Sequence, residues 1–212
     1  MKNKIGLFGG TFNPTHKGHT GVVKKILELS LFDQIYVIPS AKPPHREKVE
    51  VDFHHRFEMA KLAFQSFEHV TIDSRENFRE GPSYALDTFL SFKEEFKQKD
   101  CFWILGIDSF LTIREWHEWE RLIEAANFLI VSRPGHEINS KKRVNQILKE
   151  RSARSIEECS REKNILHLDS MDFEISSSKV RLEIESALFD SNKIDDSVIN
   201  YINKNNLYSK SI

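Results

Sequence analysis

The chain has 212 residues, a length that fits one α/β domain or two very small ones. Its 39% apolar and 30% charged residues allow a packed core and argue against global disorder. A net charge of −1 argues against a protein that grips long polyanions such as nucleic acid. Five of the 8 glycines lie within the first 21 residues, and neither glycine nor proline follows Gly135, so unusual backbone geometry is expected in the first two-thirds of the chain.

The two cysteines and the start of the chain exclude further classes. Cys101 and Cys159 are far apart and form no CxxC pattern, which argues against a disulfide scaffold or a zinc ribbon. We find no apolar stretch long enough for a signal peptide or a membrane span. A cytoplasmic protein with no membrane partner is therefore expected.

Strand-like and helix-like segments alternate along the chain. Short apolar runs predict strands over 4–8, 34–39, 70–72, 101–105 and 128–131. Helical spacing predicts helices over 18–29 and 84–96. A further helix is predicted to be capped by Asp52 and to present Phe53, Phe57, Ala60 and Phe64 on one face, and a capped terminal helix is predicted over Asp195–Asn203. Apolar strands separated by helices predict a parallel sheet covered on both faces, in a Rossmann-like doubly wound α/β fold.

No internal repeat or linker divides the chain. We therefore expect a single domain over residues 1–212, with a small helical portion from about 175 to 212. The charged stretch 139–163 is predicted to be a solvated helix. In such a fold the ligand sits beyond the carboxyl ends of the strands, where the strand order reverses.

The segment Gly9-Gly-Thr-Phe-Asn-Pro-Thr-His-Lys-Gly-His19 follows the first predicted strand. It is neither a P-loop nor a dinucleotide fingerprint. Its glycines allow close approach of a phosphate, and His16 and His19 stand three apart at the mouth of a helix, where N–H groups favour anions. Taken alone, a glycine pair is more often part of a simple turn, and a single histidine is more often a surface residue. A zinc site is disfavoured because no third ligand stands nearby at a recognisable spacing.

These residues resemble a known superfamily, the nucleotidyltransferases marked by a (H/T)xGH motif. His16-Lys-Gly-His19 matches HxGH, and Ile175-Ser-Ser-Ser-Lys-Val-Arg181 is similar to the superfamily's ISSTxxR segment. Further matching segments are Pro43-Pro-His-Arg46, Gly81-Pro-Ser-Tyr-Ala-Leu-Asp-Thr88, Gly106-Ile-Asp108, Trp116-His-Glu-Trp119 and Arg133-Pro-Gly135. Together they resemble bacterial nicotinate mononucleotide adenylyltransferases from Ile5 to about Tyr208. Asn13 and Ser178 replace the commoner Asp and Thr.

The resemblance implies transfer of AMP from ATP to nicotinate mononucleotide, with release of pyrophosphate. It implies catalytic roles for His16, His19 and Arg181, and Mg²⁺ bound with the ATP. The residues expected at ATP are Gly9, Gly10, Thr11, Phe12, His16, His19, Gly106, Asp108, Ser176, Ser177 and Arg181. Those expected at the mononucleotide are Asn13, Lys42, His45, Arg46, Ser83, Tyr84, Ala85, Trp116, His117 and Arg133.

Within these sets the resemblance implies distinct roles. Asp108 accepts from an adenosine hydroxyl, although an Asp at that place can also be a plain helix cap. Lys42, His45 and Arg46 meet the acceptor phosphate, unless they form a solvated loop. Trp116 stacks on the pyridine ring, unless it is simply core. The acid group meets backbone N–H groups near Ser83–Ala85 and His117, while Arg133 adds positive potential.

Other functions remain open on the sequence. Nicotinamide mononucleotide and phosphopantetheine are alternative acceptors, because backbone groups read part of the difference. A non-catalytic module that senses ATP is an alternative of a different class. The sequence leaves the oligomeric state open, a homo-oligomer included.

Overall fold

The computed structural model describes residues 3–44, 49–132, 143–162, 165–169, 175–186 and 190–209. Within these residues, seven parallel strands form one sheet, in the order β3-β2-β1-β4-β5-β7-β6. Their bounds are β1 Lys4–Gly10, β2 Gln34–Pro39, β3 Val70–Ile72, β4 Asp100–Gly106, β5 Asn127–Val131, β6 Ser152–Ala153 and β7 Ile165–Leu168. The predicted Rossmann-like α/β fold is confirmed.

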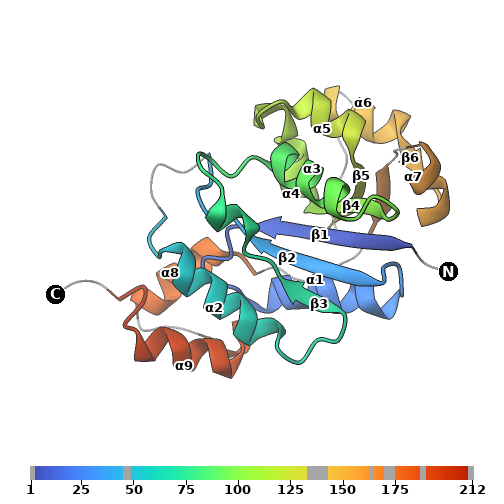
Figure 1. The fold of residues 1–212 in the computed structure, drawn as a ribbon. Coiled ribbons are helices and arrows are strands. Elements are labelled where there is room, and N and C mark those ends of the chain that lie inside the picture. The colour runs from blue at the N-terminus through green and yellow to red at the C-terminus, as the bar shows by residue number, and fades with distance from the viewer. Residues whose placement is uncertain are drawn as a thin grey trace.

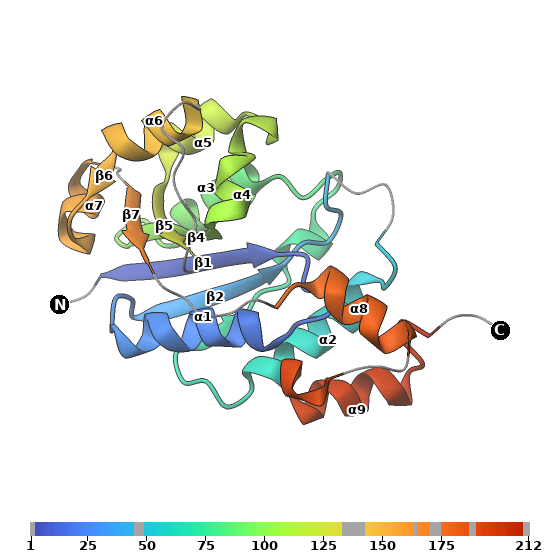
Figure 2. The same ribbon diagram turned by 180° about the vertical axis from the view of Figure 1, so that it is seen from behind.

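Helices cover both faces of this sheet (Figures 1 and 2). One face packs against α1 Lys17–Glu28, α2 Phe53–Phe64, α7 Ile156–Glu162, α8 Ser177–Glu185 and α9 Asp196–Lys204. The other packs against α3 Ala85–Glu95, α4 Ile107–Leu111, α5 Trp119–Ala125 and α6 Arg143–Glu150. Short 3₁₀ turns occur at η1 Arg75–Phe78, η2 Ile113–Glu115 and η3 Ser191–Lys193. Among the described helices, none is long and apolar enough to cross a membrane.

The alternation of side chains along the central strand β4 supplies both cores. Trp103 and Leu105 join the cluster beneath α3, α4 and α5, while Phe102 and Ile104 join the cluster that contains residues of α1 and α2. A strand with apolar side chains on both faces is stable only between two helical layers. The composition of β4 therefore fixes its place in the middle of the sheet.

The strand order reverses between β1 and β4. The chain runs outward from β1 through β2 to β3 on one side, and from β4 through β5 on the other. The loops that leave the carboxyl ends of β1 and β4 diverge to opposite faces, so a crevice opens between them. The glycine- and histidine-rich segment follows β1, and therefore enters this crevice.

Three predictions about the helices need correction. The charged stretch 139–163 is not one solvated helix: its described part forms α6, the short strand β6 and α7, and buries Val144, Leu148 and Ile156. These few apolar residues are spaced to pack, although charged neighbours dominate the composition. The strand β7 that follows was not predicted.

The buried face of α2 also differs from the prediction. Asp52 caps this helix as expected, with its carboxylate accepting from the His55 amide at 3.1 Å. However, the buried residues are Arg56, Met59, Ala60, Ala63 and Phe64, and neither Phe53 nor Phe57 is buried. At the end of the chain, Asp195 is the N-terminal flanking residue of α9 but its side chain makes no capping hydrogen bond.

Because Leu148 is 5% exposed and belongs to the core beneath α6, Leu148→Ala should lower the free energy of unfolding by about 2–5 kcal/mol. Urea unfolding monitored by circular dichroism measures this change. The neighbouring Lys149 is exposed, so Lys149→Ala should change stability by no more than about 0.5 kcal/mol. Equally small effects of both substitutions would contradict the burial of Leu148 in the core.

Candidate functional site

Two adjoining cavities lie at the carboxyl ends of β1 and β4. The first, of about 500 Å³, is here called the histidine cavity; it is lined by Phe12, His16, Gly18, His19, Gly106, Asp108, Ser132 and Ile175–Ser178, among others. The second, of about 250 Å³, is called the aromatic cavity; it is lined by Ser40, Pro43, Pro44, Glu76, Ser83–Ala85, Trp103, Trp116 and His117, among others. Residues that line both are Gly9, Gly10, Thr11, Leu105 and Ser109.

His16 and His19 form a stacked pair at the start of α1. Their ring centroids are 3.7 Å apart with 28° between the planes, and the His16 amide donates to His19 Nδ1 at 3.2 Å. Gly18 lies between them in sequence, and a Cβ atom there would approach the His16 ring to 2.9 Å. The HxGH spacing thus packs one imidazole against the backbone of the helix and brings both rings to one cavity.

The pKa of His19 lies well below its usual value of 6.5. Burial disfavours the charged imidazolium, and the neighbouring His16 adds a smaller effect of the same sign. At neutral pH the ring of His19 is therefore neutral in the ligand-free protein. Since His19 Nδ1 accepts from the His16 amide, the proton is placed on Nε2, which is left as a donor.

A second helix N-terminus faces the histidine cavity. Ser176 caps α8 by accepting from the Lys179 amide at 3.3 Å, and Ser176, Ser177 and Ser178 all line the cavity. The first N–H groups of α1 and α8 have no partner within their helices. Two helix ends that open on one cavity favour a bound anion.

Arg181 and Asn13 do not lie on the surface of either cavity; Arg181 contacts the loop after β1 from behind. Arg181 Nη1 donates to the Asn13 carbonyl at 2.8 Å, and its Nε is 3.2 Å from a carboxylate oxygen of Glu50. The buried Asn13 side chain donates to Glu50 at 2.6 Å and accepts from the Tyr208 hydroxyl at 2.6 Å. Neither Arg181 nor Asn13 lines a described cavity. The geometry gives both a positioning role, and direct contact with substrate stays a prediction.

Arg56 is a positioning residue that the sequence reasoning did not identify. It is 1% exposed, and its guanidinium donates to the carbonyls of Val51, Thr11 and Ala41 at 3.0, 2.8 and 3.4 Å. The loop after β1 and the loop after β2 therefore share one buried cation. Only the sequence position of Arg56, in the middle of an apolar helix face, could have indicated this.

At the end of β4, Gly106 and Asp108 line the histidine cavity. The hydrogen bond from a ribose hydroxyl to Asp108 that the resemblance implies stays a prediction. Asp108 is exposed and lies in the first turn of α4. Ser109 also faces both cavities, but no sequence motif had marked it.

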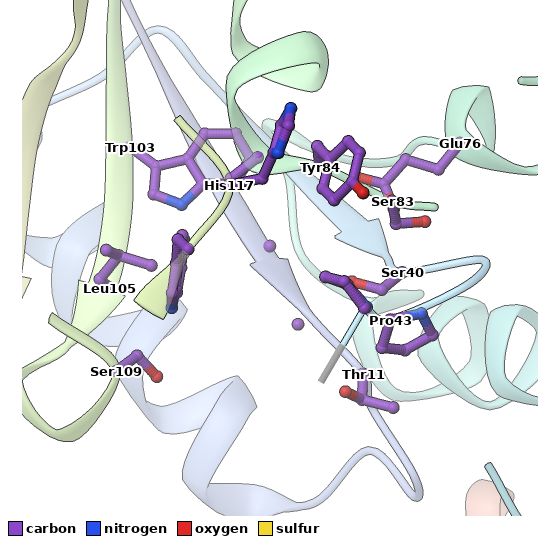
Figure 3. A pocket seen from close by; sticks show the side chains of 15 residues that line it. Thr11, Ser40, Pro43, Glu76, Ser83, Tyr84, Trp103, Leu105, Ser109 and His117 are labelled. Carbon is purple, nitrogen blue, oxygen red and sulfur yellow. The ribbon is translucent and has the colours of Figure 1, made fainter. Parts of the chain in front are cut away.

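The aromatic cavity presents flat side chains on one wall. Tyr84 and His117 stack with ring centroids 3.9 Å apart and 21° between planes, and Figure 3 shows them side by side. Trp116 also lines this cavity, whereas Trp119 does not. A flat planar ligand is the shape that such a wall accommodates best.

The loop after β2 is fastened to the start of α3. The Ser83 amide donates to the Lys42 carbonyl and the Lys42 amide donates to Ser83 Oγ, both at 2.9 Å. The Tyr84 amide donates to the Pro82 carbonyl at 3.1 Å. The amides of Ser83 and Tyr84 are thus engaged within the protein, and Ala85, which begins α3, is better placed to offer a backbone donor.

Several predicted site residues require separate comment. Lys42 is exposed and lines a third cavity beside Pro43 and Pro44, not the aromatic one. His45, Arg46 and Arg133 lie outside the described residues. Among the described residues there is no group of three or more His, Cys, Asp or Glu side chains that could hold a metal ion by itself.

Comparisons with known proteins agree on one family. A family model described as cytidylyltransferase-like matches residues 7–183. A probable nicotinate-nucleotide adenylyltransferase of Citrifermentans bemidjiense is 32% identical, over 97% of this chain and 98% of its own length. A protein of the same name from Pseudomonas paraeruginosa is 31% identical, over 98% of both chains.

The fold also recurs among solved structures. The nicotinic acid mononucleotide adenylyltransferase of Plasmodium falciparum, complexed with NaAD, matches 98% of each chain with a TM-score of 0.79 and 24% sequence identity. At that identity the match shows the shared fold.

The lowered pKa of His19 predicts how stability varies with pH. Below pH 6.5 the unfolded chain binds a proton at this position more readily than the folded chain, so the free energy of unfolding should fall as the pH is lowered. His19→Asn should make this fall smaller, as measured by urea unfolding at pH 7.5 and 5.5. The exposed His54 on α2 offers the control His54→Asn. An unchanged pH dependence in His19→Asn would show that His19 titrates normally.

Proposed function

Because the chain belongs to the cytidylyltransferase-like family and, within it, to the nicotinate-nucleotide adenylyltransferases, we propose that it transfers AMP from ATP to nicotinate mononucleotide. The products are nicotinate adenine dinucleotide and pyrophosphate, which places the reaction in NAD biosynthesis. The observation that carries the proposal is the pair of cavities that share Gly9, Gly10 and Thr11. One cavity suits a triphosphate, the other a flat ring.

The reaction joins two anions and needs no covalent intermediate on the protein. A phosphate monoester has a second pKa near ~6, so the acceptor phosphate is already largely dianionic at neutral pH. Its oxygen forms a bond to the α-phosphorus of ATP, while the bond from that phosphorus to the bridging oxygen breaks and pyrophosphate leaves. The protein's task is therefore to position the two phosphates and to stabilise charge.

The histidine cavity supplies this stabilisation. We assign the triphosphate to the N-termini of α1 and α8, where the Ser176 and Ser177 segment stands opposite the histidine pair. His19 is neutral when the site is empty, and an approaching phosphate raises its pKa, so it binds the anion as a donor. His16 and His19 contact the reacting phosphates, and Arg181 holds the loop beneath them.

The acceptor occupies the aromatic cavity. Trp116 stacks on the electron-poor pyridinium ring, and the Tyr84–His117 pair borders it. Lys42, His45 and Arg46 of the loop after β2 meet the acceptor phosphate, and Arg133 adds positive potential. The shared strip at Gly9, Gly10 and Thr11 is then where the two phosphates meet.

Nucleotidyltransferases generally use a divalent metal together with ATP, and we propose that Mg²⁺ fills this role. The described residues fit an ion that arrives on the triphosphate, because Mg²⁺ readily keeps phosphate oxygens and water as ligands and needs few protein groups. When bound with ATP, the ion would neutralise part of the charge of the triphosphate. We further propose that the whole chain works as one domain in the cytoplasm, where ATP is available.

Parallel assays of pyrophosphate release test the proposed function. With ATP and Mg²⁺, the wild-type protein should show its highest kcat/KM with nicotinate mononucleotide, a lower value with nicotinamide mononucleotide and none with phosphopantetheine. Phosphopantetheine lacks the flat cationic ring that the aromatic cavity accommodates. Faster turnover with phosphopantetheine would contradict the proposal. Calorimetric binding of ATP without pyrophosphate release for any acceptor would favour a sensor.

His19→Ala should lower kcat by about 10²-fold or more, because it removes one preorganised donor to the transferring phosphates. Circular dichroism should show an intact fold, and the KM for ATP should change much less than kcat. The exposed His54 again serves as the control, since it lies on α2 and lines neither cavity. Wild-type turnover in His19→Ala would remove this residue from the reaction.

A further inference from the structure

Trp103 carries a buried donor that the fold itself does not use. The side chain lies on β4, lines the aromatic cavity and is 3% exposed. Its indole Nε1–H has no hydrogen-bond partner among the described residues. Buried polar groups in native proteins are rarely left unpaired, so this N–H calls for a partner that enters the cavity.

The orientation of the ring is set by its contact with Gly9. A Cβ atom on Gly9 would lie 2.9 Å from Cζ2 of Trp103 and 3.7 Å from Cε2. Cη2 lies at 3.5 Å, so the six-membered ring of the indole is turned toward Gly9, and Nε1 is bonded to Cε2 at one end of that contact. Gly9 lines both cavities, and Figure 3 shows the Trp103 ring among the side chains that surround the aromatic cavity.

Resting on the proposed function, we propose that Trp103 Nε1–H donates a hydrogen bond to the carboxylate of the nicotinate ring and so helps to select the acid over the amide. An indole N–H is a donor only, and it therefore recognises acceptor atoms. A carboxylate accepts through both oxygens and forms the stronger, charge-assisted hydrogen bond. A carboxamide offers one acceptor oxygen, and its NH₂ group cannot pair with a second donor.

The cavity's own carboxylate does not compete for this donor. Glu76 Oε1 accepts from Thr88 Oγ1 at 2.7 Å, and its Oε2 accepts from the Ala41 amide at 3.3 Å. Figure 3 places Glu76 on the opposite side of the cavity from Trp103. The two ends of the cavity therefore differ in what they offer a ligand. A bound carboxylate finds a hydrogen-bond donor at the Trp103 end, and it lies away from the carboxylate of Glu76 at the other end.

Binding requires a local rearrangement. Nε1 itself has less than 1 Å² exposed in the ligand-free structure, so a lining side chain must move before an acceptor atom reaches it. Changes of side-chain rotamer of this kind are common when partners bind. Because a new acceptor would then contact the indole N–H, the NMR signal of this group should report binding directly.

Trp103→Phe tests the proposal, because Phe keeps an aromatic ring beside Gly9 and Phe89 but removes the N–H. The KM for nicotinate mononucleotide should rise ~10-fold or more, with the KM for ATP unchanged. The preference for the acid over nicotinamide mononucleotide, expressed as a ratio of kcat/KM values, should fall by a similar factor. Trp119→Phe is the matched control, since Trp119 does not line the aromatic cavity.

Nitrogen-15 NMR of the indole N–H groups gives a second test on the wild-type protein. The chain has 3 tryptophans, and the two Phe variants assign the signals of Trp103 and Trp119. Saturating nicotinate mononucleotide should move the Trp103 indole proton downfield, and nicotinamide mononucleotide should move it less. This test decides the matter even if Trp103→Phe does not fold.

Failure of the inference is distinguishable from failure of the proposed function. If the wild-type protein releases pyrophosphate with nicotinate mononucleotide but Trp103→Phe keeps its KM within twofold, the inference is wrong and the function stands. Equal losses for the acid and the amide would mean a hydrogen bond to a group that both share, which also overturns it. If the wild-type protein turns over no acceptor, the proposed function fails, and an unmoved Trp103 signal would overturn the inference separately.

Discussion

The candidate site depends on how the backbone carbonyls of the loop after β1 are satisfied. This loop is buried and irregular, so its carbonyl groups find no partners in a regular ladder and must be paired by side chains. Arg56 donates to the Thr11 carbonyl, Arg181 to that of Asn13, and Ser177 to that of Pro14. Each donor lies far along the chain from its acceptor. The loop therefore has its shape only when α2 and α8 are docked.

This dependence explains why the end of the chain matters to a site built at its beginning. The Tyr208 hydroxyl donates to the Asn13 side chain, and burial raises the pKa of that hydroxyl, which keeps it protonated as a donor. The start of α8 meanwhile faces the histidine cavity across from α1. The last third of the chain contains no glycine or proline, yet it supplies a second helix N-terminus and one of the two cations behind the loop, Arg181.

The two cavities differ in the polar groups that line them. In the histidine cavity, the described lining offers imidazoles, hydroxyls and helix N-termini, which are fixed dipoles and donors aimed at one place. In the aromatic cavity, flat rings and one buried indole donor surround a smaller volume. The strip shared between them is glycine-rich, and a Cβ atom would come to 2.9 Å from Trp103 at Gly9 and to 3.2 Å from Phe12 at Gly10. Anions can therefore approach the backbone there from both sides.

The sequence by itself determined the fold class, the positions of five strands along the chain and the location of the histidine pair. Those signals are local: apolar runs predict strands, and HxGH at the end of the first strand marks the start of a helix. It did not determine the helix–strand–helix arrangement within 143–162, where a few apolar residues are hidden among charges. Only the tertiary structure decided that Arg181 and Asn13 do not line either cavity, that Arg181 contacts the loop after β1 from behind and that Arg56 joins this loop to the loop after β2. It also decided that the indole N–H of Trp103 has no hydrogen-bond partner among the described residues. Those facts depend on contacts between residues far apart in the chain, which no local pattern encodes.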